Sequence, residues 1–574
     1  MVATPVKTKR LTVQVANLTA DTTAIRSLDW DRDRFDIEFG LQNGTTYNSY
    51  LIRGEKIALV DTSHEKFRQL YFDSLNGLIN PQEIDYLIIS HTEPDHSGLV
   101  KDLLQLAPNI TVVGSKVAIQ FLENLVHHPF QRQLVKNGDQ LDLGNGHILE
   151  FVNAPNLHWP DTIFTYDHGS GILFTCDAFG MHYCSDDLYD EQLSAIEPDY
   201  RFYYECLMAP NARSVLAAMK RMEPLGNINL VANGHGPVLK HNVTELLTRY
   251  RDWSQAQTKA EKTVAVFYIA DYGYSDRLCQ SIAKGITKTG LAVETLDLKS
   301  ADPQEVKELA SSAVGIVIGT PPVSGIHAQE ITGNLGTILA SVNPKQYLGM
   351  FESQGGDDEP ILPLFNKFRE VGLTKAFDPI RSTETPNESL YQRCEEAGTD
   401  MGQLLTQEVK VKQRKSLDTD LDKAIGRISG GLYIITTKKG DRSGAMVASW
   451  VTQASFDPPG FTVAVAKDRA IESLMQVGDQ FILNILEEGN YQTLMKHFLK
   501  RFGPGEDRFA GVNTRTANNG SPILADALAY LECEVVSRME CADHWIVYNK
   551  VTDGRVSKPD SLTAVHHRKV GNYY

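Results

Sequence analysis

The stretch 91–96, HTEPDH, places four potential metal ligands within six residues. It directly follows the apolar run IDYLIIS, which is typical of a buried strand. A rigid sheet can hold side chains that project from the end of a strand, and α/β proteins often place their chemistry there. Imidazole and carboxylate groups this close together predict a metal site. The four candidate ligands are His91, Glu93, Asp95 and His96.

Three further candidate ligands occur singly in later segments. Each lies just after an apolar run and beside Gly, Pro or Ala, in NAPNLHWPDT, LFTCDAFG and VANGHGP. We therefore expect all seven side chains to meet at one edge of one sheet. Any one of them alone is explained as well by a helix cap, a turn or a surface histidine, but seven in the same kind of position favour a shared site. The three residues are His158, Asp177 and His235.

The chain around these residues divides into three segments. At about 150–200 residues per domain, 574 residues predict three domains. Residues 30–260 mix short strands, turns and helices, and the polar segment 249–262 closes this block and connects it to the next. Residues 261–408 alternate strands and helices, which predicts a parallel, doubly wound sheet. The charged stretch 409–423 is interpreted as a linker, and the dense β-branched runs of residues 424–574 predict a β-barrel.

Composition excludes several other classes of protein. A net charge of −16 argues against a nucleic-acid binder. No apolar run approaches the ~18 residues of a transmembrane segment, and the N-terminus has no apolar signal core, so we expect a cytoplasmic protein. The seven cysteines are scattered without a CxxC pair, which argues against a zinc ribbon or a rubredoxin-type iron site.

The ligand pattern resembles that of the metallo-β-lactamase superfamily, whose usual H-x-H-x-D-H motif here reads H-x-E-x-D-H. Glu93 replaces a histidine of that motif, and hard anionic oxygens favour iron that cycles between Fe(II) and Fe(III). The resemblance therefore narrows to flavodiiron proteins and implies an αββα domain with a di-iron centre. It implies one iron on His91, Glu93 and His158, a second on Asp95, His96 and His235, and Asp177 bridging them.

The second segment is similar to a flavodoxin-like domain, which implies FMN. The loop YIADYGYSDRL would hold the FMN phosphate with backbone N–H groups, a hydroxyl and a helix N-terminus. The loops GTPPVSGIH and FESQGGDDEP match the other two flavin loops by position, although a flavodoxin fold that has lost its flavin is the alternative. The implied FMN-binding residues are Ala270, Tyr272, Gly273, Ser275, Thr320, Ser324, Ser353, Gly355 and Gly356.

The stretch 431–470 resembles flavin reductase-like split barrels, which implies a second flavin, FMN or FAD, in the C-terminal domain. The run HHRK at 566–569 is either a set of cations beside a flavin phosphate or a solvated tail. No G-x-G-x-x-G follows a strand, so a Rossmann nicotinamide site is not expected, and in split barrels the nicotinamide stacks on the flavin. The implied flavin-binding residues are Ala448, Ser449, Trp450, Ser455 and Asn484.

This order of domains is that of the flavodiiron proteins of cyanobacteria and other oxygenic phototrophs. The resemblance implies reduction of O2 to water with electrons from NAD(P)H or ferredoxin, as a photoprotective sink in the cytoplasm or beside photosynthetic membranes. It also implies a homodimer, or a heterodimer with a related chain. Two alternatives stay open: NO reduction at the same di-iron site, and a zinc hydrolase of the lactamase fold.

Overall fold

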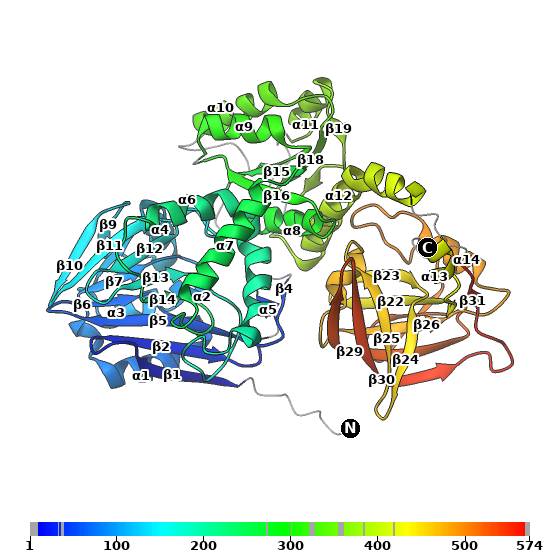
Figure 1. The fold of residues 1–574 in the computed structure, drawn as a ribbon, viewed down its shortest axis with the longest axis horizontal. Helices are drawn as coiled ribbons and strands as arrows, with labels where there is room; N and C mark the ends of the chain where they lie inside the picture. Colours follow the sequence, from blue (N-terminus) through cyan, green and yellow to red (C-terminus); the bar gives the residue numbers. More distant parts are fainter. Residues whose placement is uncertain are drawn as a thin grey trace. The chain divides into compact units, whose positions relative to one another are not determined.

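The computed structural model describes residues 10–32, 34–35, 39–270, 274–299, 301–320, 328–353, 361–382, 385–416 and 420–568. They fall into two compact units, Met1–Glu261 and Lys262–Tyr574 (Figure 1). Every helix among these residues is too short or too polar to cross a membrane.

The first unit contains a seven-stranded sheet and a five-stranded sheet with helices outside both. The seven strands lie in the order β1 (Leu11–Asn17), β2 (Thr22–Asp29), β5 (Thr45–Arg53), β6 (Ile57–Val60), β7 (Tyr86–Ile89), β8 (Thr111–Gly114) and β9 (Gln131–Leu134). The five strands lie in the order β10 (Gln140–Gly144), β11 (His147–Asn153), β12 (Ile163–Asp167), β13 (Ile172–Cys176) and β14 (Leu230–Asn233). A short pair, β3 (Arg34–Phe35) and β4 (Phe39–Gly40), stands apart.

Three apolar layers hold this unit together. Ile52, Ile88, Phe151 and Phe174 meet between the two sheets. One outer layer is covered by α1 (Arg68–Leu78), α3 (Val100–Leu106) and α4 (Lys116–Val126), and the other by α5 (Leu193–Tyr203), α6 (Ala212–Met222) and α7 (Val243–Thr258). This is the αββα architecture that the lactamase resemblance implied.

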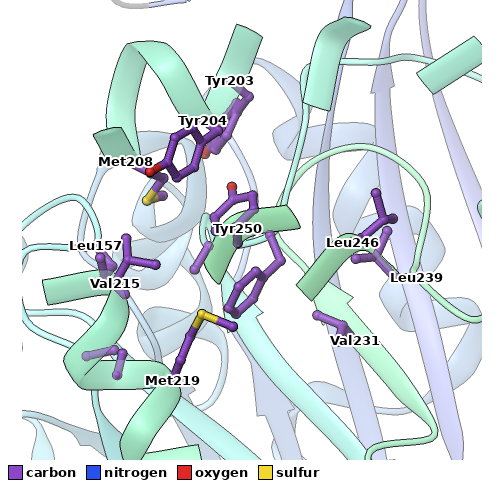
Figure 2. Close-up of a cluster of buried hydrophobic side chains, with 14 of the residues drawn as sticks. Leu157, Tyr203, Tyr204, Met208, Val215, Met219, Val231, Leu239, Leu246 and Tyr250 are labelled. Atoms are coloured by element: carbon purple, nitrogen blue, oxygen red, sulfur yellow. The ribbon is translucent and has the colours of Figure 1, made fainter. Parts of the chain in front are cut away.

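The segment 249–262, expected to be a polar connector, is mostly helical. It forms the end of α7, where Tyr250 is fully buried and Trp253 packs against the same cluster (Figure 2). Tyr250 and Trp253 are three residues apart, which places them on one face of the helix, but the polar residues around them in the sequence favoured a connector. Strands β1 and β2 also lie before residue 30, so the sheet begins earlier than the predicted boundary.

The second unit begins with a parallel sheet in the order β16-β15-β17-β18-β19, with β20 also paired to β18. This strand order is that of flavodoxin-like folds. The strands are β15 (Thr263–Tyr268), β16 (Ala292–Asp297), β17 (Gly315–Thr320), β18 (Tyr347–Glu352), β19 (Thr374–Lys375) and β20 (Ile380–Arg381). The helices are α8 (Ser275–Thr287), α9 (Pro303–Ser312), α10 (Ala328–Ser341), α11 (Ile361–Glu370) and α12 (Glu388–Ser416).

The same unit ends in an antiparallel sheet in the order β23-β22-β26-β29-β30-β25-β24, wrapped around a core that includes Phe461, Phe481 and Val547. The strands are β22 (Tyr433–Lys439), β23 (Arg442–Ala448), β24 (Val451–Phe456), β25 (Pro459–Ala466), β26 (Gln480–Ile485), β29 (Ala529–Cys541) and β30 (His544–Val556). Smaller elements are α13 (Asp420–Ile425), α14 (Gln492–Leu499), the pair β21 (Gly430–Gly431) and β31 (Val565–His566), and the pair β27 (Thr514–Thr516) and β28 (Pro522–Leu524).

Helix α12 has two different faces. On one face, Gly398 touches α8 so closely that a Cβ there would lie 2.1 Å from the Ile282 carbonyl oxygen. The other face meets the barrel through polar groups: Gln392 donates to the Ser443 carbonyl, and Glu396 pairs with Arg508. The helix continues to Ser416, and α13 begins at Asp420, so much of the stretch 409–423 that was interpreted as a linker is helical.

Candidate metal centre and flavin sites

The seven predicted metal ligands come together in the first unit. Four of them belong to one turn, in which Glu93 occupies the position before the short helix α2 (Pro94–Ser97) without a side-chain capping bond. His91, Glu93, Asp95 and His96 follow β7, His158 follows β11, Asp177 follows β13 and His235 follows β14.

The expectation of a single sheet edge was wrong. Strand β7 belongs to the seven-stranded sheet, whereas β11, β13 and β14 belong to the five-stranded sheet. The centre therefore lies where the ends of two facing sheets meet. An apolar run in a sequence shows that a strand is buried but not which sheet it joins, so this arrangement was not readable from the pattern.

His91, Glu93 and His158 form what we call the Glu93 half-site. The Glu93 Oε2 atom lies 3.0 Å from His158 Nε2 and 3.4 Å from His91 Nε2. The Asp177 Oδ2 atom lies 3.4 Å from His158 Nε2 and 3.5 Å from His91 Nε2. Two imidazole nitrogens and two carboxylate oxygens thus face a common point, as a metal ion requires.

Asp95, His96 and His235 form the Asp95 half-site. The Asp95 carboxylate lies 3.5 Å from His96 Nε2 and 3.4 Å from His235 Nε2 through its two oxygens. The other oxygen of Asp177, Oδ1, lies 2.9 Å from His96 Nε2 and 3.1 Å from His235 Nε2. Asp177 therefore presents one oxygen to each half-site, which is the geometry of a bridging ligand.

Close packing around the Asp95 half-site explains the first of the two glycines in VANGHGP, Gly234. A Cβ atom at Gly234 would lie only 2.7 Å from the Cε1 atom of His96. The backbone amide of Asn48 on β5 donates to the Gly234 carbonyl, which anchors the loop that carries His235. Position 234 therefore needs a residue without a side chain so that both histidines fit.

The centre is buried but keeps one open side. The side chains of His91, His96 and Asp177 are at most 1% exposed, whereas Glu93 and Asp95 are 14% and 21% exposed. Solvent therefore contacts the centre on the side of these two carboxylates. Three buried polar atoms at the centre have no hydrogen-bond partner among the described residues: Asp95 Oδ1, Asp177 Oδ2 and His96 Nδ1.

Charge coupling dominates the protonation of the ligands in the metal-free chain. Burial alone would lower the pKa of His96, but Asp95 and Asp177 overcome this and raise it to about 9. Burial likewise opposes the charged form of His158, but the carboxylates of Asp177 and Glu93, which both face its Nε2 atom, raise its pKa to about 10. Both imidazoles therefore hold protons at pH 7 where a metal would bind.

Metal loading should therefore release protons. The pKa of His91 is also raised well above its usual value, because Asp161 and Asp177 outweigh the effect of burial. At pH 7 we expect the metal-free chain to give up roughly three protons from His91, His96 and His158 for each pair of divalent ions bound, since only neutral imidazole can act as a ligand. Because the folded-state pKa values are raised, affinity should increase as pH rises from 7 towards 9. A pH indicator in weak buffer measures the release. A His96→Gln variant should release about one proton fewer, and equal release from both proteins would contradict this assignment.

The structure adds outer partners that the sequence did not single out. The carboxylate of Asp161 accepts from His91 Nδ1 at 2.9 Å, and the Thr46 carbonyl accepts from His235 Nδ1 at 2.6 Å. His182 packs on His235, with ring centroids 4.6 Å apart, and its Nδ1 atom lies 2.7 Å from Thr45 Oγ1. Only the position of Asp161, three residues after His158, could have pointed to its role from the sequence. The role of the Thr46 carbonyl leaves no trace in a sequence, because every residue has a backbone carbonyl.

The described part of the predicted FMN site is compatible with phosphate binding. Helix α8 begins at Ser275, whose hydroxyl lies 2.7 Å from that of Ser353. The Ala270 amide donates to Asp297, so this amide is already used within the domain. Thr320 is the last residue of β17. Tyr272, Gly273, Ser324, Gly355 and Gly356 lie outside the described residues.

Three predicted flavin residues of the barrel lie at the junction of β23 and β24. Ala448 and Ser449 are buried, and the Ser449 hydroxyl has no hydrogen-bond partner among the described residues. Trp450 is partly exposed and lies between the His544 ring, at 5.1 Å, and the Arg568 guanidinium, at 5.0 Å. The run 566–569 thus brings at least one cation to the predicted site.

The other two barrel residues are engaged within the protein. The Ser455 hydroxyl donates to the Pro458 carbonyl and lies 2.9 Å from that of Tyr548. Asn484 is fully buried, donates to Ile434 O and Thr436 Oγ1, and accepts from the Leu524 amide. Since its amide joins three parts of the barrel, Asn484 is a structural residue rather than a flavin ligand, which corrects the prediction. Its position near the end of a strand gave the misleading signal.

Comparisons with known proteins agree with this arrangement. The model of the "Flavin reductase like domain" family matches residues 425–573, and that of the "ODP family beta lactamase" matches residues 45–236. The chain is 71% identical to Diflavin flavoprotein A 1 from Synechocystis sp., over 99% of this chain and 98% of that protein. It is 69% identical to Putative diflavin flavoprotein A 3 from Nostoc sp., over the full length of both. Among solved structures, the metal-soaked Flv1 flavodiiron core from Synechocystis sp. is 38% identical, with a TM-score of 0.64, and covers 69% of this chain and 99% of that one.

Proposed function

Because the chain belongs to the diflavin flavoprotein A family of flavodiiron proteins, we propose that it reduces O2 to water with electrons from NAD(P)H or a photosynthetic donor. The observation that carries this proposal is the double half-site bridged by Asp177, in a chain that also contains a flavodoxin-like fold and a flavin reductase-like barrel. The cofactors of such a diflavin flavodiiron protein are a di-iron centre, FMN and a second flavin in the C-terminal domain. The matched family and the flavin domains weigh against a zinc hydrolase.

The donor set fits a pair of iron ions. Four imidazoles and three carboxylates converge, and the unpaired oxygens of Asp95 and Asp177 are the atoms that bound ions would satisfy. Iron and flavin together supply the four electrons that O2 requires when both are bound.

The residues of the chain supply geometry and electrostatics. Asp177 fixes the spacing of the two half-sites, and the outer partners of His91 and His235 hold each ring with Nε2 turned towards the centre. Burial of these histidines keeps bulk water from competing for the ligand atoms. We place the approach of a small substrate on the side of Glu93 and Asp95, because these two predicted ligands are the most exposed of the seven.

The test is O2 consumption by the purified chain loaded with iron and flavin. We expect NADH, NADPH or reduced ferredoxin to support consumption with little release of peroxide, and the donor giving the highest rate identifies the physiological class. Parallel assays with NO decide between the two gaseous substrates, because the same ligands would serve both. Rapid NO reduction with negligible O2 consumption, or accumulation of one peroxide per O2, would contradict the proposal.

We also propose that the active unit is a dimer, either of this chain or with a related chain. The di-iron centre and the flavodoxin-like domain lie in separate compact units. Electron transfer between cofactors needs close approach, and a two-fold pair can place the flavin of one chain against the metal centre of the other. In a phototroph, such a protein would act in the cytoplasm or beside photosynthetic membranes and draw off excess electrons.

A further inference from the structure

Three of the four predicted ligand histidines differ in what surrounds Nδ1, the ring nitrogen that faces away from the centre. The Nδ1 atom of His91 faces the carboxylate of Asp161, at 2.9 Å. The Nδ1 atom of His235 faces a neutral carbonyl, that of Thr46, at 2.6 Å. The Nδ1 atom of His96 is buried and has no partner among the residues that the structure describes. The outer nitrogen thus faces an anion in His91, a neutral dipole in His235 and no partner among the described residues in His96.

Asp161 is fixed firmly in this position. Its side chain is fully buried, and its second oxygen accepts from the Thr92 amide at 2.7 Å and from the Thr92 hydroxyl at 2.5 Å. Its backbone carbonyl accepts from Ser115, which also caps α4. Thr92 lies directly beside His91, so the carboxylate and the ligand are held by the same turn. These hydrogen bonds fix the Asp161 carboxylate against His91, so the contact is a defined part of the surroundings of the centre.

Among the described residues, no carboxylate accepts from the outer nitrogen of a histidine in the Asp95 half-site. The buried carboxylate of Asp61 acts on the charge of His96 through space, but it accepts from the Ser90 amide at 2.8 Å, and none of its hydrogen bonds among the described residues goes to a metal ligand. The two half-sites therefore have the same number of inner ligands but different outer hydrogen bonds. A carboxylate that accepts from a ligand imidazole increases the basicity of the other ring nitrogen and strengthens its bond to a metal.

We propose that Asp161 is a positioning residue that makes the two half-sites unequal. Acting through His91, it causes the Glu93 half-site to bind its metal more tightly than the Asp95 half-site and to favour the more highly charged ion. This inference deepens the proposed function and rests on it only for the identity of the metal, iron. In a half-reduced centre, Fe(III) would then occupy the Glu93 half-site and Fe(II) the Asp95 half-site.

The first test uses the full-length, metal-free chain titrated with Co(II), whose absorption bands report occupied sites. Wild-type protein should bind in two separate steps. In Asp161→Asn, we expect the tighter step to weaken by ~10–100-fold while the weaker step stays unchanged. Equal weakening of both steps, or no change in either, would overturn the proposal.

The chain offers a matched control elsewhere in the same domain. Asp167 is fully buried and accepts from His147 Nδ1 at 2.7 Å, but neither residue touches the metal ligands in the described structure. Asp167→Asn removes the same charge from the same kind of pair. Both Co(II) steps should stay as in wild type. If this variant reproduces the effect of Asp161→Asn, the effect is one of general destabilisation and the proposal fails.

The reduction potentials of the iron centre give a further test, because a purely structural role of Asp161 would not shift one couple alone. In the iron-loaded chain, reduced stepwise with dithionite and followed by electron paramagnetic resonance, Asp161→Asn should raise the lower-potential couple alone. A tenfold loss specific to Fe(III) corresponds to 59 mV for a one-electron couple, so we expect about 60–120 mV. A shift of both couples together would contradict the inference.

A separate measurement covers the case in which Asp161→Asn does not fold. Crystals of wild-type chain given one equivalent of Co(II) should show anomalous scattering mainly at the Glu93 half-site. Equal occupancy, or preference for the Asp95 half-site, would overturn the proposal without any variant. None of these measurements requires turnover, so a protein that reduced NO rather than O2 would still give the expected results.

Discussion

Replacing Asp177 with alanine is expected to empty the whole metal centre, whereas replacing Glu93 should empty only half of it. Asp177 lies 2.9 Å from His96 with one oxygen and 3.4 Å from His158 with the other, so its removal takes a ligand from both half-sites. Losing the bridge also removes a negative charge that faces both half-sites. We expect iron to fall from two ions per chain to nearly none and O2 consumption to disappear.

The comparison with Glu93→Ala makes this prediction specific. Among the predicted ligands in the described structure, the Glu93 carboxylate contacts His91 and His158, both in one half-site, so its loss should cost roughly one iron per chain and leave the flavins in place. Elemental analysis and the visible flavin spectrum of the two variants give the answer. If Asp177→Ala retained one iron firmly, or if Glu93→Ala lost both, then the bridging assignment would be wrong.

The second large effect is expected from a chain that ends at Ser416. It should keep its iron and FMN but lose oxidation of NAD(P)H almost completely, because the flavin reductase-like barrel is the proposed entry point for electrons. A cut at this residue spares the packing of α12, where the Leu405 carbonyl accepts from Lys262. It also leaves the buried Lys288 with its own-domain partner Glu395 after Glu472 of the barrel is removed.

Two controls accompany the shortened chain. Its circular dichroism should show a folded protein, and an artificial donor such as dithionite-reduced methyl viologen should still drive O2 consumption. Oxidation of NAD(P)H at the rate of the full-length chain would show that electrons enter elsewhere. Loss of activity with every donor would indicate that the cut damaged the remaining domains rather than the entry point.

The metal ligands were predictable because each residue carried two independent signals in the sequence. His91, Glu93, Asp95 and His96 combine ligand chemistry with a position directly after a buried strand. The structure brings all of them together with His158, Asp177 and His235, although on two sheets. Pairing of strands depends on contacts between distant residues, and no local pattern records it.

The outer partners show the limit of reasoning from a sequence. Asp161 lies in a turn, where aspartate is common for reasons unrelated to metals, so its type and position alone say little. The Thr46 partner is a backbone carbonyl, which every residue has. The prediction for Asn484 shows the opposite problem. A polar residue at a strand end suggested a flavin contact, but in the structure its side chain joins β22, β26 and the segment at Leu524. The roles of these three residues depend on which residues lie beside them in the folded chain, and the sequence does not record this.

The two faces of α12 bear on how such a chain could have arisen. Its face towards α8 belongs inseparably to the flavodoxin-like domain, since Gly398 leaves no room for a side chain. Its face towards the barrel is made of groups such as Gln392, Glu396 and Asp400, which water can satisfy equally well. An ancestor that ended in this helix would have exposed these polar groups to water. Gene fusion could therefore append a reductase behind the helix, or deletion could remove it, with no compensating change in the preceding domain.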